Sequence, residues 1–257
     1  MESVSSPPVL FQRQSTSETQ WRPWLQQHLS RPEPFAQWLP DTARLVVLAP
    51  HPDDEVLACG ALLALHTARG GESLIVAITD GEASHREAQG QHLINEKKLA
   101  QMRCAERAQG LQALDLGAEH LTSLHLPDGE LAFHETEVVR RVTAMLRPAD
   151  VIVSPWRFDG HPDHDACGRA AARVSATTGC ALWEAPIWMW HWARPNDVRV
   201  PWLRMQALAV STAASASKQA ALAAHVSQLT PRSDGFGAVL DGASVARAAR
   251  RAEYFFV

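Results

Sequence analysis

The amino-acid sequence predicts an α/β protein with a mostly parallel, doubly wound sheet. Short aliphatic runs alternate with longer segments of good helix formers, and these runs are continuous, without alternation of polar and apolar residues. Continuous runs are typical of strands buried on both faces, and strand–helix–strand connections make neighbouring strands parallel. Polar residues follow the ends of several runs, as they do at the ligand-binding edge of such sheets. We therefore expect a Rossmann-like fold of three layers, with helices on both faces of the sheet.

The first half of the chain shows the alternation clearly. Residues 45–49 (LVVLA) are aliphatic throughout and predict a buried strand, and residues 55–69 continue as an apolar helix. Residues 73–79 (SLIVAIT) predict a second strand, which a long hydrophilic loop follows. Residues 95–117 carry apolar side chains at helical spacing and end at a glycine, a common helix stop. Residues 120–126 predict the next strand.

The second half continues the alternation and ends with further strands. Residues 135–146 predict a helix, residues 150–154 (DVIVS) a short buried strand, and the alanine-rich residues 166–178 another helix. The tryptophan-rich residues 182–192 are expected to be strand in part. The remaining expected elements are a strand, a helix and a terminal strand at residues 204–210, 215–229 and 252–257.

The length and composition fit one large domain. A chain of 257 residues with 46% hydrophobic residues can bury a sizeable core. We expect a single domain over residues 41–257. Residues 1–40 are rich in Ser, Gln and Pro and contain Trp21, Trp24 and Trp38, which predicts an N-terminal extension made of a loose tail and a short helix packed on the domain.

Charge, apolar runs and cysteine spacing argue against several classes of protein. A formal net charge of −4 gives no reason to expect a nucleic-acid partner, and the basic residues 247–251 are expected on a solvated helix face. No apolar run approaches the ~20 residues that span a bilayer, and residues 1–8 lack the features of a signal peptide. The 4 cysteines show no C-x-x-C spacing, so neither a disulfide framework nor a thiolate zinc site is indicated. We expect a soluble, cytoplasmic protein.

Two clusters of histidine and aspartate follow the expected strands at 45–49 and 150–154. The first contains His51, Asp53 and Asp54, and the second contains His161, Asp163 and His164. Because the carboxyl ends of parallel strands meet at one edge of the sheet, we expect the two clusters to lie together. Any one of these residues could be a surface or helix-capping residue, but the pairing of two such clusters favours a functional site.

Part of this set is suited to a metal ion. His51, Asp54 and His164 would supply two imidazole nitrogens and one carboxylate oxygen. Such a set suits one zinc ion with an open position for water, and it also accepts iron, manganese or cobalt. Zinc lowers the pKa of bound water towards ~7, and the adjacent Asp53 can take the proton as the water attacks a carbonyl. The two adjacent aspartates are therefore expected to point in different directions.

The second cluster also offers a hydrogen-bond donor beside the metal. We expect His161 to donate to the oxyanion of a tetrahedral intermediate and Asp163 to hold the other ring nitrogen of His161. Weaker candidates for contacts with a substrate are Arg86, Arg103, Asp128 and Trp188. A structural ion pair with a carboxylate is the alternative for Arg103, and a place in the core or an interface is the alternative for the tryptophans.

Two motifs resemble those of a known enzyme family. Residues 49–55 (APHPDDE) and residues 160–164 (GHPDH) closely resemble the paired motifs of the zinc-dependent PIG-L, or LmbE-like, de-N-acetylases. The resemblance runs over residues 44–172 and includes residues 79–83 (TDGEA) and 126–129 (LPDG). Arg103 and Glu106 also fall within it. The resemblance implies the three-layer LmbE-like fold.

The resemblance implies the same roles that the residues themselves suggest. The implied metal ligands are His51, Asp54 and His164. Asp53 would be the general base, and His161, oriented by Asp163, would be the acid or the oxyanion stabiliser. Members of the family remove acetyl groups from N-acetylglucosamine units. The implied cofactor is therefore one zinc ion per chain, and the implied partner is a small-molecule N-acetylated substrate.

Two other functions stay open. One is metal-dependent hydrolysis of a different bond, such as a phosphoester or a non-sugar amide, although a two-metal phosphoesterase needs more ligands than this set offers. The other is a non-catalytic, Rossmann-like ligand-binding protein, although no G-x-G-x-x-G motif follows the first strand. The tryptophan-rich residues 183–192 are also compatible with the interface of a homo-oligomer.

Overall fold

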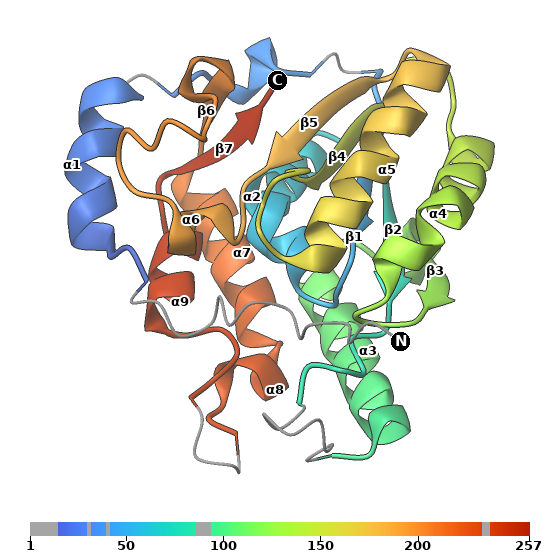
Figure 1. Cartoon of the computed structure of the whole chain (residues 1–257). Coiled ribbons are helices and arrows are strands. Elements are labelled where there is room, and N and C mark those ends of the chain that lie inside the picture. Colours follow the sequence, from blue (N-terminus) through green and yellow to red (C-terminus); the bar gives the residue numbers. More distant parts are fainter. Residues whose placement is uncertain (1–14, 30–31, 40–41, 86–93, 233–236) are drawn as a thin grey trace, which may run out of the picture.

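A central sheet lies between two layers of helices (Figure 1). The structure, a computed structural model, describes residues 15–29, 32–39, 42–85, 94–232 and 237–257. The strands are β1 (Leu45–Ala49), β2 (Ser73–Thr79), β3 (Leu121–Leu126), β4 (Val151–Pro155), β5 (Ala181–Ala185), β6 (Met205–Ala209) and β7 (Ala252–Phe256).

The helices alternate with these strands for most of the chain. They are α1 (Glu18–His28), α2 (Asp54–Ala68), α3 (Glu96–Gln112), α4 (Leu131–Met145), α5 (Pro162–Thr178), α6 (Met189–Trp192), α7 (Thr212–Ala223), α8 (Val226–Leu229) and α9 (Gly242–Ala248). Short 3₁₀ turns cover Phe35–Gln37, Ala118–His120 and Trp202–Arg204.

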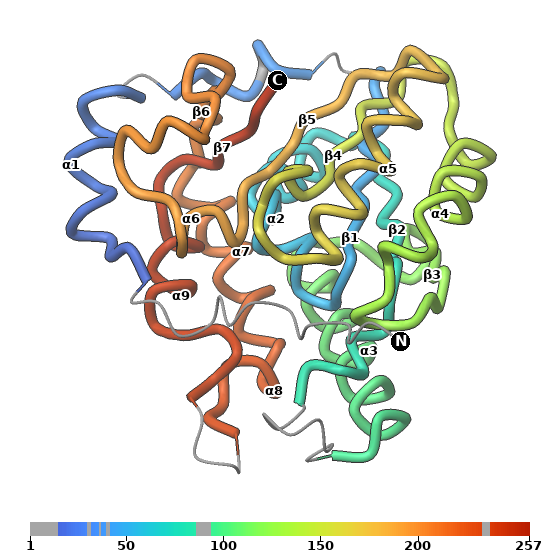
Figure 2. Tube along the Cα trace, in the orientation of Figure 1, coloured from blue at the N-terminus to red at the C-terminus, as the bar shows by residue number. Residues whose placement is uncertain are grey.

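The order of the strands places a topological switch point at the centre of the sheet. The order is β3-β2-β1-β4-β5-β7-β6, and among the strands of the described residues only β7 runs antiparallel to its neighbours, β5 and β6. The predicted mostly parallel, doubly wound sheet is therefore confirmed. Figure 2 shows the chain running outward from β1 to β3, returning to β4 beside β1, and continuing in the other direction. Open sheets of this kind bind ligands beyond the carboxyl ends of the strands at such a reversal.

Strand β1 shows why the aliphatic runs are continuous. Leu45 and Val47 pack in the core with α2, α3 and α7, whereas Val46 and Leu48 pack in the core with α4 and α5. Successive side chains of a strand point to opposite faces of the sheet, so a strand covered on both faces needs an apolar residue at every position.

The described part of the N-terminal extension packs on the antiparallel end of the sheet. Trp21 and Trp24 of α1 belong to a core cluster with Trp190, Met205 and Phe256. The indole N–H of Trp21 donates to the carbonyl of Trp190 at 3.0 Å. The helix expected within residues 1–40 thus covers apolar surface. The division into residues 1–40 and 41–257 stays a prediction.

Several element boundaries differ from the sequence-based expectation. The helix expected from residue 166 begins at Pro162, so Asp163 and His164 lie in its first turn. The single helix expected over residues 215–229 is instead two, since α7 ends at Ala223 and α8 follows. Proline is favoured in the first turn of a helix, which explains the start of α5 at Pro162. Alanine favours helix, which explains α7, but this composition does not reveal the break between α7 and α8.

The expected solvated face at residues 247–251 is wrong for Arg247. This side chain is 8% exposed and donates to His191 Nε2 at 2.9 Å, to Ser15 Oγ at 2.6 Å and to the Thr16 carbonyl at 3.3 Å. The arginine therefore joins α9 to α6 and to the residues just before α1, which a local charge pattern does not show. Within the described ranges, none of the helices combines the length and apolar character needed to cross a bilayer.

Candidate metal centre and active site

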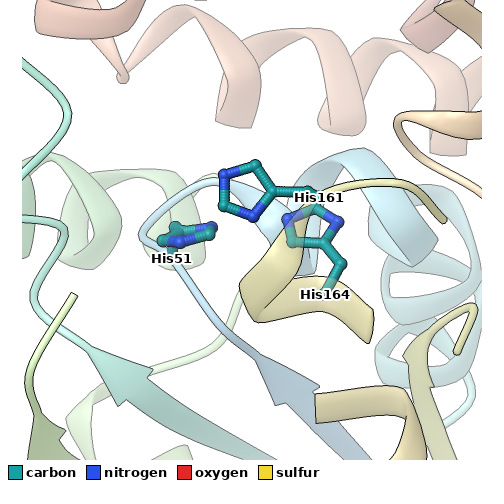
Figure 3. Close-up of side chains that lie close together, drawn as sticks. All are labelled: His51, His161 and His164. Atoms are coloured by element: carbon teal, nitrogen blue, oxygen red, sulfur yellow. The ribbon is translucent and has the colours of Figure 1, made fainter. Parts of the chain in front are cut away.

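The two predicted clusters lie together at the switch point between β1 and β4. His51 lies in the turn between β1 and α2, His161 is the N-cap residue of α5, and His164 lies in the first turn of α5. Figure 3 shows the three imidazole rings grouped above the end of β1. One ring nitrogen from each histidine lies within 4.8 Å of the others, as metal ligands do.

The Asp54 carboxylate lies between two of these rings. Its Oδ2 is 3.1 Å from His51 Nδ1 and 3.2 Å from His164 Nε2, and it accepts the His51 backbone N–H at 2.9 Å. Burial alone would raise the pKa of Asp54, but His164 and His51 hold it well below its ordinary value. The predicted ligand set His51, Asp54 and His164 is thus brought together.

The orientation of His164 leaves one ring nitrogen for a ligand. His164 Nδ1 lies 2.7 Å from Asp159 Oδ2, while His164 Nε2 is buried and has no hydrogen-bond partner among the described residues. Burial opposes protonation of His164, but Asp54 and Asp159 raise the pKa of His164 to about 9. The Nε2 of His164 is thus buried without a hydrogen bond and lies next to the Asp54 carboxylate, while Asp159 fixes the ring through Nδ1. This arrangement fits an imidazole that binds a metal ion.

A second group of possible ligand atoms overlaps the first at His51. His51 Nε2 lies 3.2 Å from Asp128 Oδ1 and 3.2 Å from Asp163 Oδ2. Burial would raise the pKa of Asp128, but His51 and Arg103 lower it. Two overlapping sets of side chains could therefore hold a metal ion, namely His51 with His161 and His164, and His51 with Asp128 and Asp163.

The Asp53 carboxylate lies against Arg103. The φ angle of Asp53 is 132°, a value that residues with a side chain rarely adopt, and Asp53 Oδ2 lies 3.3 Å from Arg103. Arg103 also donates to the carbonyls of Pro52 and Gly81, both at 2.9 Å. Burial raises the pKa of Asp53 to about 7, with Arg103 opposing the shift. The structure shows the ion pair that was the alternative for Arg103.

Gly81 makes room for that arginine. Its φ is +72°, and a Cβ built there would lie 2.2 Å from Arg103 Nη1. No side chain other than hydrogen leaves the guanidinium in place, so this glycine of the residue 79–83 motif has a packing reason. Sequence reasoning assigned no role to it.

The partners of His161 and Asp163 differ from the expected ones. His161 Nδ1 accepts the backbone N–H of Asp163 at 3.2 Å. The Asp163 carboxylate instead accepts the backbone N–H groups of Gly129 at 2.8 Å and Leu131 at 3.2 Å, besides its contact with His51. The expectation that this carboxylate holds His161 is corrected, because the first turn of α5 directs it toward His51 and the start of α4. Nδ1 of His161 as an acceptor leaves Nε2 as the N–H donor.

Of the weaker candidates for substrate contacts, Asp128 and Trp188 lie beside the site histidines. Asp128 accepts the Ala83 backbone N–H at 2.8 Å and lies against His51. The Trp188 ring lies beside the His161 ring, with ring centres 5.9 Å apart. Arg86 lies outside the described residues.

Asp159 is a site residue that sequence reasoning missed. It is fully buried, lies against His164, and accepts the backbone N–H groups of residues 187–189 at 2.8 to 2.9 Å. Its carboxylate therefore connects the tryptophan-rich segment to the candidate metal ligand His164. The spacing of five positions between Asp159 and His164 is a weak signal by itself. The other partners of Asp159, the backbone N–H groups of residues 187–189, lie too far along the chain for a local pattern to show them.

The fold and the site together define a Rossmann-like α/β protein with a candidate metal centre at the switch point of the sheet. The profile of the PIG-L family, described as GlcNAc-PI de-N-acetylase, matches residues 46–175. The chain belongs to this family. The matched range contains all the predicted site residues except Trp188.

Named relatives of the chain are deacetylases. The 1D-myo-inositol 2-acetamido-2-deoxy-alpha-D-glucopyranoside deacetylase of Mycolicibacterium gilvum is 29% identical, and the alignment covers 76% of this chain and 84% of the relative. The probable N-acetyl-alpha-D-glucosaminyl L-malate deacetylase 2 of Bacillus subtilis is 28% identical over 51% of this chain and 59% of its own length.

A solved structure has the same fold. The A40926 pseudoaglycone deacetylase has a TM-score of 0.62 and 18% identity, and the match covers 84% of this chain and 97% of that one. At this identity the likeness supports the fold alone.

Proposed function

We propose that the protein is a metal-dependent N-deacetylase that hydrolyses the acetamide group of a small molecule. The observation that carries the proposal is the position of Asp54 between His51 and His164, with the buried His164 Nε2 lacking a hydrogen bond within the described part of the chain. Two imidazoles and one carboxylate are three ligands, and a metal ion with three protein ligands keeps a coordination position for a water or a substrate oxygen.

Zinc is the ion that we propose for this group, with one ion per chain. His51, Asp54 and His164 would hold it, since the donor set of two nitrogens and one carboxylate oxygen suits zinc. When bound, zinc polarises a carbonyl and lowers the pKa of water towards ~7. Asp159 and Asp163 then hold His164 and His51 from behind and fix the directions of their rings.

Asp53 is proposed as the general base. Its carboxylate lies next to Asp54 in sequence but points to Arg103, so it does not compete for the same ring nitrogens. Arg103 is itself fixed by hydrogen bonds that it donates to the carbonyls of Pro52 and Gly81, so it holds the Asp53 carboxylate in one place. From there Asp53 can take a proton from the attacking water and later return it to the departing amine.

His161 is proposed as the donor to the oxygen that becomes negative as water adds to the amide carbonyl. Its Nδ1 is engaged by the Asp163 backbone N–H, which directs the Nε2–H to the site. Burial, together with His164 and His51, lowers the pKa of His161, so the ring is a neutral donor. Collapse of the tetrahedral adduct breaks the C–N bond and releases acetate and a free amine.

The substrate proposed for this site is an N-acetylglucosamine-containing small molecule. The named relatives carry this chemistry in their descriptions, either as a 2-acetamido-2-deoxy-glucopyranoside or as an N-acetyl-glucosaminyl compound. We propose that Trp188, whose ring lies beside that of His161, contacts the sugar ring. We further propose that residues 41–257 form the catalytic domain.

The test measures acetate and free amine released from a panel of N-acetylated sugars, amino acids and small amides, with zinc added. Phosphoesters are included because hydrolysis of another bond is the rival activity. We expect acetate from at least one N-acetylglucosamine compound and no phosphate from any phosphoester. Phosphate release, or the absence of acetate across the panel with metal bound, would overturn the proposal.

A further inference from the structure

Helix α2, which begins with the candidate ligand Asp54, is broken in its middle. Cys59 has φ −151° and ψ 27°, values outside the helical region, so α2 consists of a short first segment and a longer second segment. A break in a helix leaves backbone N–H and C=O groups on either side without partners within the helix. Because α2 is buried, these groups must find partners elsewhere.

Glu253 of β7 supplies acceptors for the second segment. One carboxylate oxygen accepts the Ala61 N–H and the other accepts the Leu62 N–H, both at 2.8 Å. Glu253 therefore acts as a helix cap that comes from a residue far along the chain.

Lys218 of α7 supplies a donor for the first segment. Its Nζ donates to the Leu57 carbonyl at 3.1 Å and to the Glu253 carboxylate at 2.7 Å. Lys218 is 5% exposed and Glu253 is 4% exposed, so the charges of this pair are compensated inside the protein. The two side chains join both sides of the break.

The fit of the lysine depends on the residue next to the break. A Cβ built on Gly60 would lie 3.1 Å from Lys218 Cγ and 3.3 Å from Val56 Cγ1, which is closer than ordinary contact. Helix α7 packs along α2 (Figure 1), so the lysine stem passes directly over this glycine.

We propose that Lys218 and Glu253 are positioning residues for the metal centre, because they hold the first segment of α2 at the angle that places Asp54 between His51 and His164. This inference rests on the proposed function. The first segment is short, carries Asp54 and is joined to the turn with His51. Lys218 and Glu253 together form a clamp on the break in α2. Without this clamp, the first segment can extend the regular helix of the second segment, and the Asp54 carboxylate then moves relative to His164 on α5.

Both clamp residues lie outside the range that the family profile matches, residues 46–175. The matched range contains the proposed ligands but not the side chains that hold the break. Through Lys218 and Glu253, the C-terminal part of the chain thus acts on the metal centre by way of α2.

The experiment compares zinc affinity, kinetic constants at saturating zinc and thermal stability for a set of variants. Lys218→Met and Glu253→Gln remove the clamp, and Glu253→Gln keeps the shape of the buried side chain. Lys218→Arg is the conservative variant. Arg44→Met is the matched control, because Arg44 forms another buried ion pair, 2.6 Å from Asp150, at the opposite end of β1 from His51. His164→Ala removes a proposed ligand.

We expect Lys218→Met and Glu253→Gln to weaken zinc binding by about 10- to 100-fold, the range seen when groups that support ligands are removed. At saturating zinc they should lower kcat and leave KM close to that of the unchanged protein. Lys218→Arg should restore most of the affinity. Arg44→Met should lower the melting temperature and leave zinc affinity unchanged.

The outcomes separate this inference from the proposed function. If His164→Ala binds zinc as the unchanged protein does, the proposed metal centre is wrong. If His164→Ala loses zinc but Glu253→Gln binds it with normal affinity and kcat, the metal centre stands and the positioning role is wrong. Equal losses of zinc affinity in Arg44→Met and the clamp variants would also overturn the positioning role. If Lys218→Met does not fold, Glu253→Gln decides.

Discussion

The Asp159 carboxylate lies 2.7 Å from Nδ1 of His164 and at the same time accepts three consecutive backbone N–H groups, those of residues 187–189. One buried side chain thus fixes the direction of a candidate metal ligand and the start of helix α6. The same segment carries Trp188, whose ring lies beside His161. Asp159 therefore sets the position of Trp188 together with that of the His164 imidazole.

Replacement of Asp159 should weaken metal binding. In Asp159→Asn the acceptor for the His164 Nδ1–H and for several backbone donors is partly lost, so we expect zinc affinity to fall by about 10- to 100-fold. A competition titration with a zinc-binding dye measures it. Asp241→Asn is the control, because Asp241 also caps a helix, accepting the Ser244 N–H at 2.8 Å, but does so in α9. Normal zinc affinity in Asp159→Asn would contradict the role of this carboxylate.

Replacement of Asp53 should remove turnover and leave the metal in place. Asparagine has nearly the same shape as aspartate and is among the residues that tolerate positive φ, so Asp53→Asn should fold despite the φ of 132° at this position. We expect kcat to fall by about 10²- to 10⁴-fold, the usual contribution of a general base. Acetate release and zinc content of the same preparation are measured together. A zinc-loaded Asp53→Asn protein with near-normal kcat excludes Asp53 as the base.

A side chain at Gly81 should affect catalysis through Arg103. In Gly81→Ala the new methyl group overlaps the guanidinium, which then cannot hold Asp53, so kcat should fall by at least about 10-fold. Gly179→Ala is the matched control, since Gly179 also has a positive φ of +75° but a methyl group added there would meet no atom within 4 Å. Both variants should lose stability of about 1–2 kcal/mol from the left-handed backbone. Equal kcat values in the two variants would show that the contact with Arg103 is unimportant.

Acid should destabilise the contact between α6 and α9. Burial, together with Arg247, lowers the pKa of His191 to about 4, and His191 Nε2 accepts an N–H of Arg247 at 2.9 Å. An unfolded histidine has a pKa near ~6.5, so the unfolded state takes up a proton first as the pH falls. The His191 contribution to the free energy of unfolding should therefore be complete above about pH 7 and be lost progressively toward about pH 4.

Urea denaturation at several pH values checks this dependence. His191→Gln keeps an acceptor for Arg247 but cannot titrate, so its free energy of unfolding should change less over the same range. An unchanged pH dependence in His191→Gln would assign the acid sensitivity to other groups.

The sequence predicts the fold well because the relevant signals are local. The aliphatic run at residues 45–49 and the similar run before Ser154 reflect burial on both faces, and their polar ends mark the edge of the sheet at which the site lies. The approach of His51 to His164 follows from this topology, since β1 and β4 are neighbours.

The contacts around the site are less predictable because they join distant segments. Asp163 turns to His51 and the start of α4, Asp159 binds the backbone beyond β5, and Lys218 and Glu253 meet at a break in α2. None of these contacts has a spacing that a pattern can show. Each arises from the way that helices pack on a finished sheet, so the structure was needed to find them.

The central claim is that a metal ion held by His51, Asp54 and His164 is required for removal of an acetyl group. Its most direct test is acetate release from an N-acetylglucosamine-containing substrate as zinc is added to the metal-free protein. We predict no release without metal, a rise that reaches its plateau at one zinc per chain, and no rise in His164→Ala. Full activity in the metal-free protein, or a plateau reached equally by His164→Ala, would contradict the claim.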